Sequence, residues 1–147
     1  MENNIRLRVA AILMDENRIL LVRHMKSGKD YWLLPGGGVH YTENLETALK
    51  RELKEETNLD IQMRKLMFVN DSIPLDGHRH VLNFTFLCDI VSGTLKLIPE
   101  EVLKEAKFFE ISELKNLTFY PNLKSEILDA YKNNFSDYEK YLGNRWE

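Results

Sequence analysis

The chain has 147 residues, of which 44% are hydrophobic and 29% charged, a composition typical of one globular domain rather than of a disordered chain. Its formal net charge of −3 excludes the basic field that favours binding to bulk nucleic acid. No apolar run approaches the roughly 20 residues that span a bilayer, and the single cysteine, Cys88, excludes a disulfide framework. We therefore expect one cytoplasmic domain over residues 1–147, with residues 135–147 as a C-terminal tail.

The first part of the chain predicts four strands before a helix. Residues 5–14 and 18–24 have the apolar patterning of two strands joined as a hairpin. They are followed by a polar loop at 25–30 and by a short strand at 31–34, which a proline ends. A last brief strand is expected at 39–41, after a run of three glycines.

The helix is predicted to begin after an N-cap at Thr42 and to run to about Thr57. Leu45 opens its apolar stripe. Asn58 stands where a residue in the left-handed conformation is expected, and asparagine is the second choice after glycine at such a position.

The second part of the chain combines further strands with two helices. Strand patterns cover residues 61–70, 80–91 and 106–111. Ser112 is expected to cap a short helix, and a longer amphipathic helix is expected from Asn122 to about Tyr131. Because strands occur both in hairpins and beside helices, we predict the α/β class, with a mixed sheet and helices packed on it.

Three glutamates, Glu52, Glu55 and Glu56, lie within one turn of the first predicted helix. At about 100° per residue, Glu55 falls roughly 60° to one side of Glu52 and Glu56 roughly 40° to the other. Leu49 and Leu53 fall at roughly 60° and 100° on the same wheel, so the acidic group overlaps the apolar stripe. Carboxylates that serve only solubility are expected on the opposite face of the helix.

Carboxylates turned toward a core repel one another, and burying an unpaired ion costs several kcal/mol. A divalent cation removes this penalty. Oxygen ligands favour a hard ion, so we expect Mg²⁺ (or Mn²⁺), which shares its ligands with substrate phosphates. Such a site suits hydrolysis at a phosphoryl centre. The glycines at 36–38 support this hypothesis because glycine lets the backbone approach a metal or a phosphate closely.

With these residues in view, the stretch from Gly37 to Leu59 resembles the Nudix box of the Nudix hydrolases. The residues in register with that motif are Gly37, Glu43, Arg51, Glu52, Leu53, Glu55, Glu56 and Leu59. Asn58 replaces the last glycine of the motif, which the capping argument explains. Residues 32–37 extend the likeness upstream. The resemblance implies an α/β/α sandwich with a mixed β-sheet.

The resemblance also implies roles for individual residues. The implied metal ligands are the carboxylates of Glu52, Glu55 and Glu56 and the carbonyl of Gly36. Glu43 and Arg51 would hold the loop and the helix together. On the helix wheel Arg51 lies near the edge of the acidic face, so it either orients a glutamate through a bidentate pair or is an ordinary surface arginine, and we favour the orienting role. The general base would be a glutamate of the box or an acid on a later loop. The candidates on that loop are Glu100, Glu101 and Glu105, of which Glu101 and Glu105 rank together ahead of the third.

Residues outside the motif do not decide which substrate the protein binds. Arg23 either contacts a phosphate or a base, or is an ordinary polar residue at a strand end. Trp32 either stacks on a base or packs in the core. Arg79 either binds a terminal phosphate or is an ordinary loop arginine. The aromatic tail packs either on its own domain or on a second subunit, and we favour a homodimer.

The resemblance implies a hydrolase that acts on a phosphoanhydride bond of a small nucleotide, without a membrane partner. The first hypothesis is cleavage of a nucleoside diphosphate linked to another moiety, such as ADP-ribose or a nucleotide sugar, with release of a nucleoside monophosphate. The second is a house-cleaning pyrophosphatase of (oxidised) nucleoside triphosphates. The third is a catalytically silent Nudix domain that senses a ligand or binds a partner. The complete set of acids argues against the third.

Overall fold

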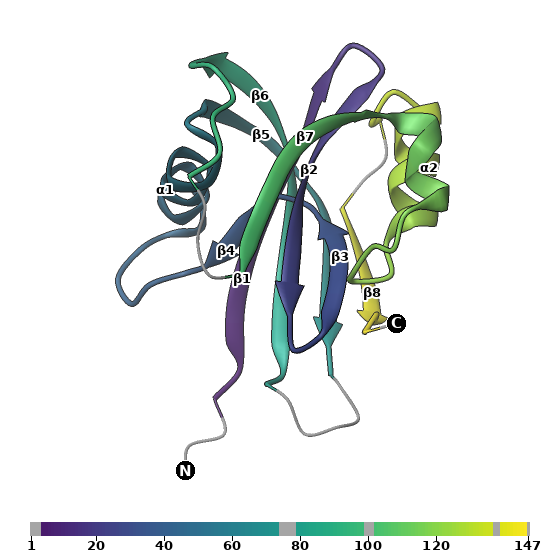
Figure 1. The fold of residues 1–147 in the computed structure, drawn as a ribbon. Helices are drawn as coiled ribbons and strands as arrows, with labels where there is room; N and C mark the ends of the chain where they lie inside the picture. Colours follow the sequence, from purple (N-terminus) through teal and green to yellow (C-terminus); the bar gives the residue numbers. More distant parts are fainter. Residues whose placement is uncertain (1–3, 74–78, 99–101, 137–138, 147) are drawn as a thin grey trace.

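The computed structural model describes residues 4–73, 79–98, 102–136 and 139–146 (Figure 1). The elements in these ranges are β1 (Arg6–Asp15), β2 (Arg18–Lys26), β3 (Lys29–Leu33), β4 (Gly36–Gly38), α1 (Leu45–Thr57), β5 (Asp60–Ser72), β6 (Val81–Ser92), β7 (Leu103–Glu110), the 3₁₀ helix η1 (Ile111–Asn116), α2 (Lys124–Lys132) and β8 (Lys140–Asn144). Among them, no helix combines the length and the apolar character needed to cross a bilayer.

The strands of the described residues form one mixed sheet with the order β3-β2-β1-β6-β5-β8, in which β4 also pairs with β1 and β7 with β2. β1 is parallel to β6 and β5 is parallel to β8, whereas the other pairs are antiparallel. α1 packs on one side of the sheet, and η1 and α2 pack on the other (Figure 1). The predicted α/β sandwich with a mixed sheet is confirmed.

Side chains along β1 alternate between two hydrophobic cores. Val9, Ala11 and Leu13 pack with the residues of α1, whereas Ala10 and Ile12 pack with those of η1 and α2. All five are buried. A strand that is covered on both faces needs apolar residues at every position, which explains the unbroken apolar run in its sequence.

The face of the sheet that packs on α2 becomes polar toward one end. On β1, the alternation that places Ala10 in this core places Arg8 and Arg6 on the same face nearer the N-terminus. On the neighbouring β6, Leu87 belongs to the same core, and Asn83 lies on the same face nearer the start of the strand. A cavity lies at this polar end of the sheet.

The predicted strand at 39–41 is wrong, because the strand at this place is β4, formed by the glycines themselves. Gly36, Gly37 and Gly38 pair with β1, and a Cβ atom at Gly36 would overlap the backbone of Val9. Strand propensity does not predict this element, since glycine is ordinarily depleted in strands. Only the absence of a side chain allows so close an approach.

The predicted helix N-cap at Thr42 is also wrong. α1 begins at Leu45, and Asn44 is its N-cap, with its side-chain oxygen accepting a hydrogen bond from the backbone N–H of Thr47 at 2.8 Å. Thr42 lies in the preceding loop with a φ of 74°. The predicted end of the helix is confirmed, since Asn58 has left-handed backbone angles (φ 64°, ψ 18°).

Two caps and one loop in the remaining chain differ from the predictions. Glu110 rather than Ser112 caps η1, where its side chain and that of Glu113 form a capping box. α2 begins at Lys124, two residues later than predicted. The loop expected at 25–30 is shorter, because β2 and β3 continue to a tight turn at Ser27 and Gly28, which both have positive φ. The other predicted strands are present with slightly different bounds.

The C-terminal tail packs on its own domain. β8 pairs with β5 in parallel register, and the hydroxyl of Tyr141 donates a hydrogen bond to Asp71 at 2.5 Å. Beyond β8, the ring of Trp146 stacks near that of Tyr120, with 6.2 Å between ring centroids. Of the two arrangements considered for the tail, the structure therefore has the one in which the tail packs on its own domain. The expected homodimer stays a prediction.

Candidate active site

The glycine strand, β4 (Gly36–Gly38), lies directly against the glutamates of α1. The backbone N–H of Gly36 donates to Oε1 of Glu56 at 2.9 Å, and the Glu56 side chain is buried. A Cβ atom on Gly37 would overlap the carboxylate of Glu52. The strand therefore needs glycine on both of its faces, since Gly36 has no room beside β1 and Gly37 has none beside Glu52.

Arg51 joins the loop, the glycine strand and the glutamates of α1. Its guanidinium donates to both carboxylate oxygens of Glu43, at 2.7 and 2.8 Å. It also donates to the carbonyl of Gly38 at 3.0 Å and to Oε1 of Glu52 at 2.8 Å. The bidentate pair that we expected for Arg51 is thus with Glu43, while Glu52 receives a single bond. This arrangement holds the loop before the helix against the helix.

The electrostatics of this cluster follow from those contacts. Hydrogen bonds from Arg51, and next the backbone N–H of His40, lower the pKa of Glu43 to about 2. The same pairing with Glu43 raises the pKa of Arg51. Both groups therefore keep their charges throughout the neutral range, and the loop remains attached to α1 by a permanent ion pair.

The three glutamates of the motif differ in exposure. Glu56 is buried and the Glu52 side chain is 16% exposed, but the Glu55 side chain is 53% exposed and lies 3.4 Å from Arg51. Within the described residues, no three acidic, histidine or cysteine groups lie close enough to complete a metal site. The donor chemistry nevertheless fits a hard divalent cation, because the groups around Gly36 and Gly37 are carboxylate and carbonyl oxygens.

The later acids considered as general base lie outside this cluster or outside the described residues, and Glu105 lies on a strand rather than on the expected loop. Glu105 is on β7, and its carboxylate accepts a hydrogen bond from Arg23 at 3.1 Å. Glu100 and Glu101 fall in the range 99–101, outside the described residues.

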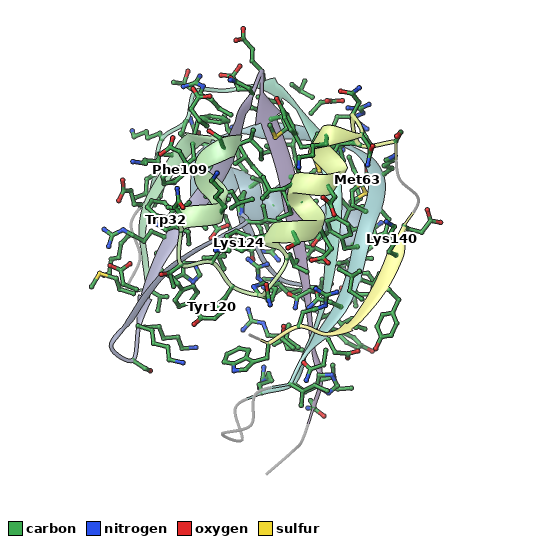
Figure 2. All side chains as sticks on the ribbon, turned by 90° about the vertical axis from the view of Figure 1, so that its right-hand side faces the viewer. Trp32, Met63, Phe109, Tyr120, Lys124 and Lys140 are labelled. Carbon is green, nitrogen blue, oxygen red and sulfur yellow. The ribbon has the colours of Figure 1, made fainter. Side chains whose placement is uncertain are left out.

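Two of the three residues suggested for substrate binding are engaged with other parts of the protein. Arg23 bonds to Asp30 and to Glu105, each at 3.1 Å. Trp32 is half-buried and packs edge-on against Phe109, 4.7 Å between centroids (Figure 2). Arg79 is exposed and lies just before β6. Neither Arg23 nor Trp32 lines the cavity at the polar end of the sheet.

That cavity has a volume of about 240 Å³ and is open to solvent. Its basic residues are Arg6 and Arg8 of β1, and His24 and Lys26 of β2. None of the described residues that line it is acidic. Arg6 and Arg8 were not predicted from the sequence, although two arginines at alternate positions at the start of an apolar strand are a signal that could have been found.

The cavity adjoins the glycine strand through Arg8. This residue lies opposite Gly38 in the register of β1 and β4, and its guanidinium donates to the carbonyl of Leu34 at 2.9 Å. Burial lowers the pKa of Arg8, and the negative charge of Glu56 is the largest opposing effect. Arg8 thus lies within the electrostatic influence of the glutamate cluster while lining the cavity.

Aromatic rings form the other part of the cavity. His24 lies 5.8 Å from Tyr31, Tyr31 lies 5.3 Å from Tyr120, and Tyr120 lies 6.2 Å from Trp146, measured between ring centroids. Burial, and then the charges of Arg8 and Lys26, lower the pKa of His24 to about 4. Its imidazole is therefore neutral at pH 7.

A mixed sheet between helices, with a glycine strand packed on the glutamates of one helix, defines the class of this protein. The same fold occurs in a Nudix hydrolase structure from Nitrosomonas europaea, with a TM-score of 0.77 and 21% identity over 89% of this chain and 90% of that chain. The NUDIX domain model matches residues 4–131. This chain therefore belongs to the Nudix hydrolase family, whose members act on phosphoanhydride bonds.

Two relatives show the range within the family. An ADP-ribose pyrophosphatase of Methanocaldococcus jannaschii is 37% identical over 76% of this chain and 65% of its own length. An NAD-capped RNA hydrolase of Vibrio atlanticus is 25% identical over 82% of this chain and 43% of its own length. The matched regions thus span less than two thirds of either relative.

Proposed function

We propose that this protein is a metal-dependent pyrophosphohydrolase of a nucleoside diphosphate linked to another moiety, of the ADP-ribose or nucleotide-sugar type, and that it releases a nucleoside monophosphate. The observation that carries the proposal is the packing of Gly36 and Gly37 on the carboxylates of Glu56 and Glu52. The similarity to an archaeal ADP-ribose pyrophosphatase supports the substrate type.

In this proposal, Glu52, Glu55 and Glu56 and the carbonyl of Gly36 hold Mg²⁺ (or Mn²⁺). When bound, the metal neutralises phosphate oxygens and supplies an activated water. The partial exposure of Glu55 places one acid where an ion and a phosphate can reach it from solvent. The burial of Glu56 and its bond from Gly36 fix a second acid in place.

Arg51 is a positioning residue in this scheme. Its bonds to Glu43 and to the Gly38 carbonyl keep the glycine strand at a constant distance from α1, and its bond to Glu52 orients that carboxylate. Site geometry of this kind is sensitive to small displacements, because misplacing a group by about 1 Å can cost roughly 100-fold in rate.

The candidates for the general base are a glutamate of α1 and, later in the chain, Glu101 and Glu105. The bond from Arg23 holds Glu105 on β7 in a defined position, which a base that acts on a water requires. A Glu105→Gln variant tests the last of these candidates, because it lowers kcat only if Glu105 takes the proton.

The test of the proposed function is hydrolysis of ADP-ribose with and without Mg²⁺, followed as AMP formed. Glu56→Gln and Glu55→Gln are expected to lower the rate by at least roughly 100-fold. Glu46→Gln is the matched control, because Glu46 is on the same helix but pairs only with Lys50 at 3.7 Å among the contacts described. Full turnover in both Glu55→Gln and Glu56→Gln would reject the site.

The substrate is decided by a panel of ADP-ribose, nucleotide sugars, dinucleoside polyphosphates and deoxynucleoside triphosphates. Preference for the triphosphates, including oxidised ones, would support the house-cleaning alternative. Saturable binding of a nucleotide without turnover of any compound would support a silent, ligand-sensing domain. Turnover is read from one assay of the monophosphate formed, and binding without turnover from calorimetric titration with the same compounds.

A further inference from the structure

The cavity beside the glycine strand is lined by both cationic and aromatic side chains. Arg8 lies opposite Gly38, and Arg6 lies there too, because a Cβ on Gly38 would meet its guanidinium at 2.7 Å. Tyr31, Tyr120 and Trp146 line the same cavity, with neighbouring ring centroids 5.3 and 6.2 Å apart. One molecule with an anionic part and a flat aromatic part would match both kinds of lining, and a nucleotide has that chemistry.

The size of the cavity limits what it can hold. Its volume of about 240 Å³ is below the roughly 300–1,000 Å³ of sites that enclose a whole drug-sized ligand. Ser72 and Asn83 add a buried hydroxyl and a buried amide to the lining, where the amide donates to the hydroxyl at 3.1 Å, so this part of the cavity wall is polar. The cavity therefore suits one end of the substrate rather than all of it.

Trp146 is the part of this lining that the family match does not include. The NUDIX domain model covers residues 4–131, whereas Trp146 follows β8 in the tail. Figure 2 shows Tyr120 below the helices, in the region between the hairpin of β2 and β3 and the strand β8. The tail thus brings an additional ring to a cavity built otherwise from the matched domain.

The position of Trp146 is fixed by the residue before it. The backbone N–H of Arg145 donates to the carbonyl of Asp71 at 2.8 Å, and its carbonyl accepts a bond from the backbone N–H of Asn122 at 3.0 Å. Its guanidinium forms an ion pair with Glu126 at 3.0 Å. The Trp146 ring itself lies 6.2 Å from that of Tyr120 and 5.9 Å from the ammonium group of Lys29. The ring is therefore pre-organised rather than loosely attached.

We propose that Trp146 is a specificity-determining residue, and that with Tyr120 it forms the surface on which the base of the nucleotide substrate stacks, while Arg8 and Arg6 face the phosphates. This inference rests on the proposed function for the nature of the substrate. It adds that a residue of the tail, outside the matched residues 4–131, contributes to base selectivity.

The test uses product binding without metal, so that it does not depend on turnover. Trp32 and Trp146 are the two tryptophans of the chain, so Trp32→Phe leaves Trp146 as the fluorescent reporter. In EDTA, AMP is expected to quench this fluorescence and to bind roughly tenfold or more tightly than ribose 5-phosphate, which lacks the base. Equal binding of the two compounds, or binding of AMP without quenching, would overturn the proposal.

Calorimetry on the chain with its own Trp32 gives an independent measurement. Trp146→Ala is expected to weaken AMP binding by roughly tenfold, toward that of ribose 5-phosphate, while Trp146→Phe keeps most of the affinity. Lys140→Ala, an exposed change in the same tail, is the matched control and should bind like the parent chain. Thermal unfolding confirms that each variant is folded.

Kinetics separate this proposal from the proposed function. Trp146→Ala should raise KM for ADP-ribose by roughly tenfold and leave kcat within about a factor of two. Unchanged AMP affinity and unchanged KM in folded Trp146→Ala would reject a role for the tail, even if Glu56→Gln abolishes turnover. Loss of base selectivity in Trp146→Ala supports the role, whatever Glu56→Gln does.

Discussion

The backbone N–H of Gly36 donates to Oε1 of Glu56 at 2.9 Å, which connects two residues that are 20 positions apart in the sequence. One partner is a glycine that tolerates no Cβ beside β1, and the other is a glutamate buried at the end of α1. The bond satisfies a backbone donor and an otherwise costly buried carboxylate together.

Gly36 and Gly37, whose Cα atoms face opposite sides of β4, should respond differently to substitution by alanine. In Gly36→Ala the new Cβ would overlap the backbone of Val9, which cannot move aside, so the free energy of unfolding should fall by at least roughly 1–3 kcal/mol. In Gly37→Ala the overlap is with the flexible end of Glu52, so the fold should persist while hydrolysis is lost. Urea denaturation and the AMP assay measure the two effects.

A glycine substitution elsewhere controls for this comparison. A Cβ at Gly28 would meet nothing within 4 Å, and asparagine tolerates its positive φ of 77°. Gly28→Asn should therefore fold and hydrolyse like the parent chain. If Gly36→Ala were as stable as Gly28→Asn, the close approach of β4 to β1 would be refuted.

Arg51→Lys should impair both stability and turnover although it keeps the charge. A lysine cannot reproduce the bidentate pair with Glu43 and the bonds to Gly38 and Glu52. We expect a loss of roughly 1–3 kcal/mol in the free energy of unfolding and roughly 10- to 100-fold in kcat/KM. Arg64→Lys, at an exposed pair with Asp89, should change stability by less than about 0.5 kcal/mol. Equal behaviour of the two variants contradicts the prediction.

The pair of Glu43 and Arg51 should give the protein an acid-sensitive component of stability. The pKa of Glu43 is lowered in the folded chain from 4.5 to about 2, so the folded state holds fewer protons on this group than the unfolded state between these values. The stabilisation is therefore complete above about pH 4.5 and is lost as the pH falls toward about 2. Urea midpoints of the parent chain and of Glu43→Gln should differ at pH 7 and converge as the pH falls toward about 2. A constant difference would refute this.

The pKa of His24 should lie far below that of an ordinary histidine. Burial, with the charges of Arg8 and Lys26, lowers its pKa from 6.5 to about 4 in the folded chain. Because the unfolded chain binds the proton more readily, stability should decline as the pH falls from about 6.5 to about 4. A titration of the four histidines by NMR should show one with a pKa near 4, absent in His24→Gln. A value near 6.5 would contradict the buried position.

Local patterns were sufficient for most of the elements, β4 and β8 excepted, and for the acidic face of α1. The 3.6-residue period of Leu45, Leu49 and Leu53 predicted the helix and the side on which Glu52 and Glu56 lie, and the observed burial of Glu56 agrees. Glu55 at the edge of that group is half-exposed instead. The helix start was missed because Thr42 and Asn44 are both acceptable caps, and only the loop geometry selects Asn44.

The α/β class, the glutamates with their upstream glycines, and the resemblance to a family that the domain match then established could all be inferred from the amino-acid order. These features consist of residue types at short, regular spacings, which periodicity makes readable. The folded chain was needed to show that Arg51 holds Glu43, that Arg8 adjoins the glycine strand, and that Trp146 lines the same cavity. Such contacts depend on strand register and on how the tail packs, and these are set by long-range burial rather than by neighbouring residues.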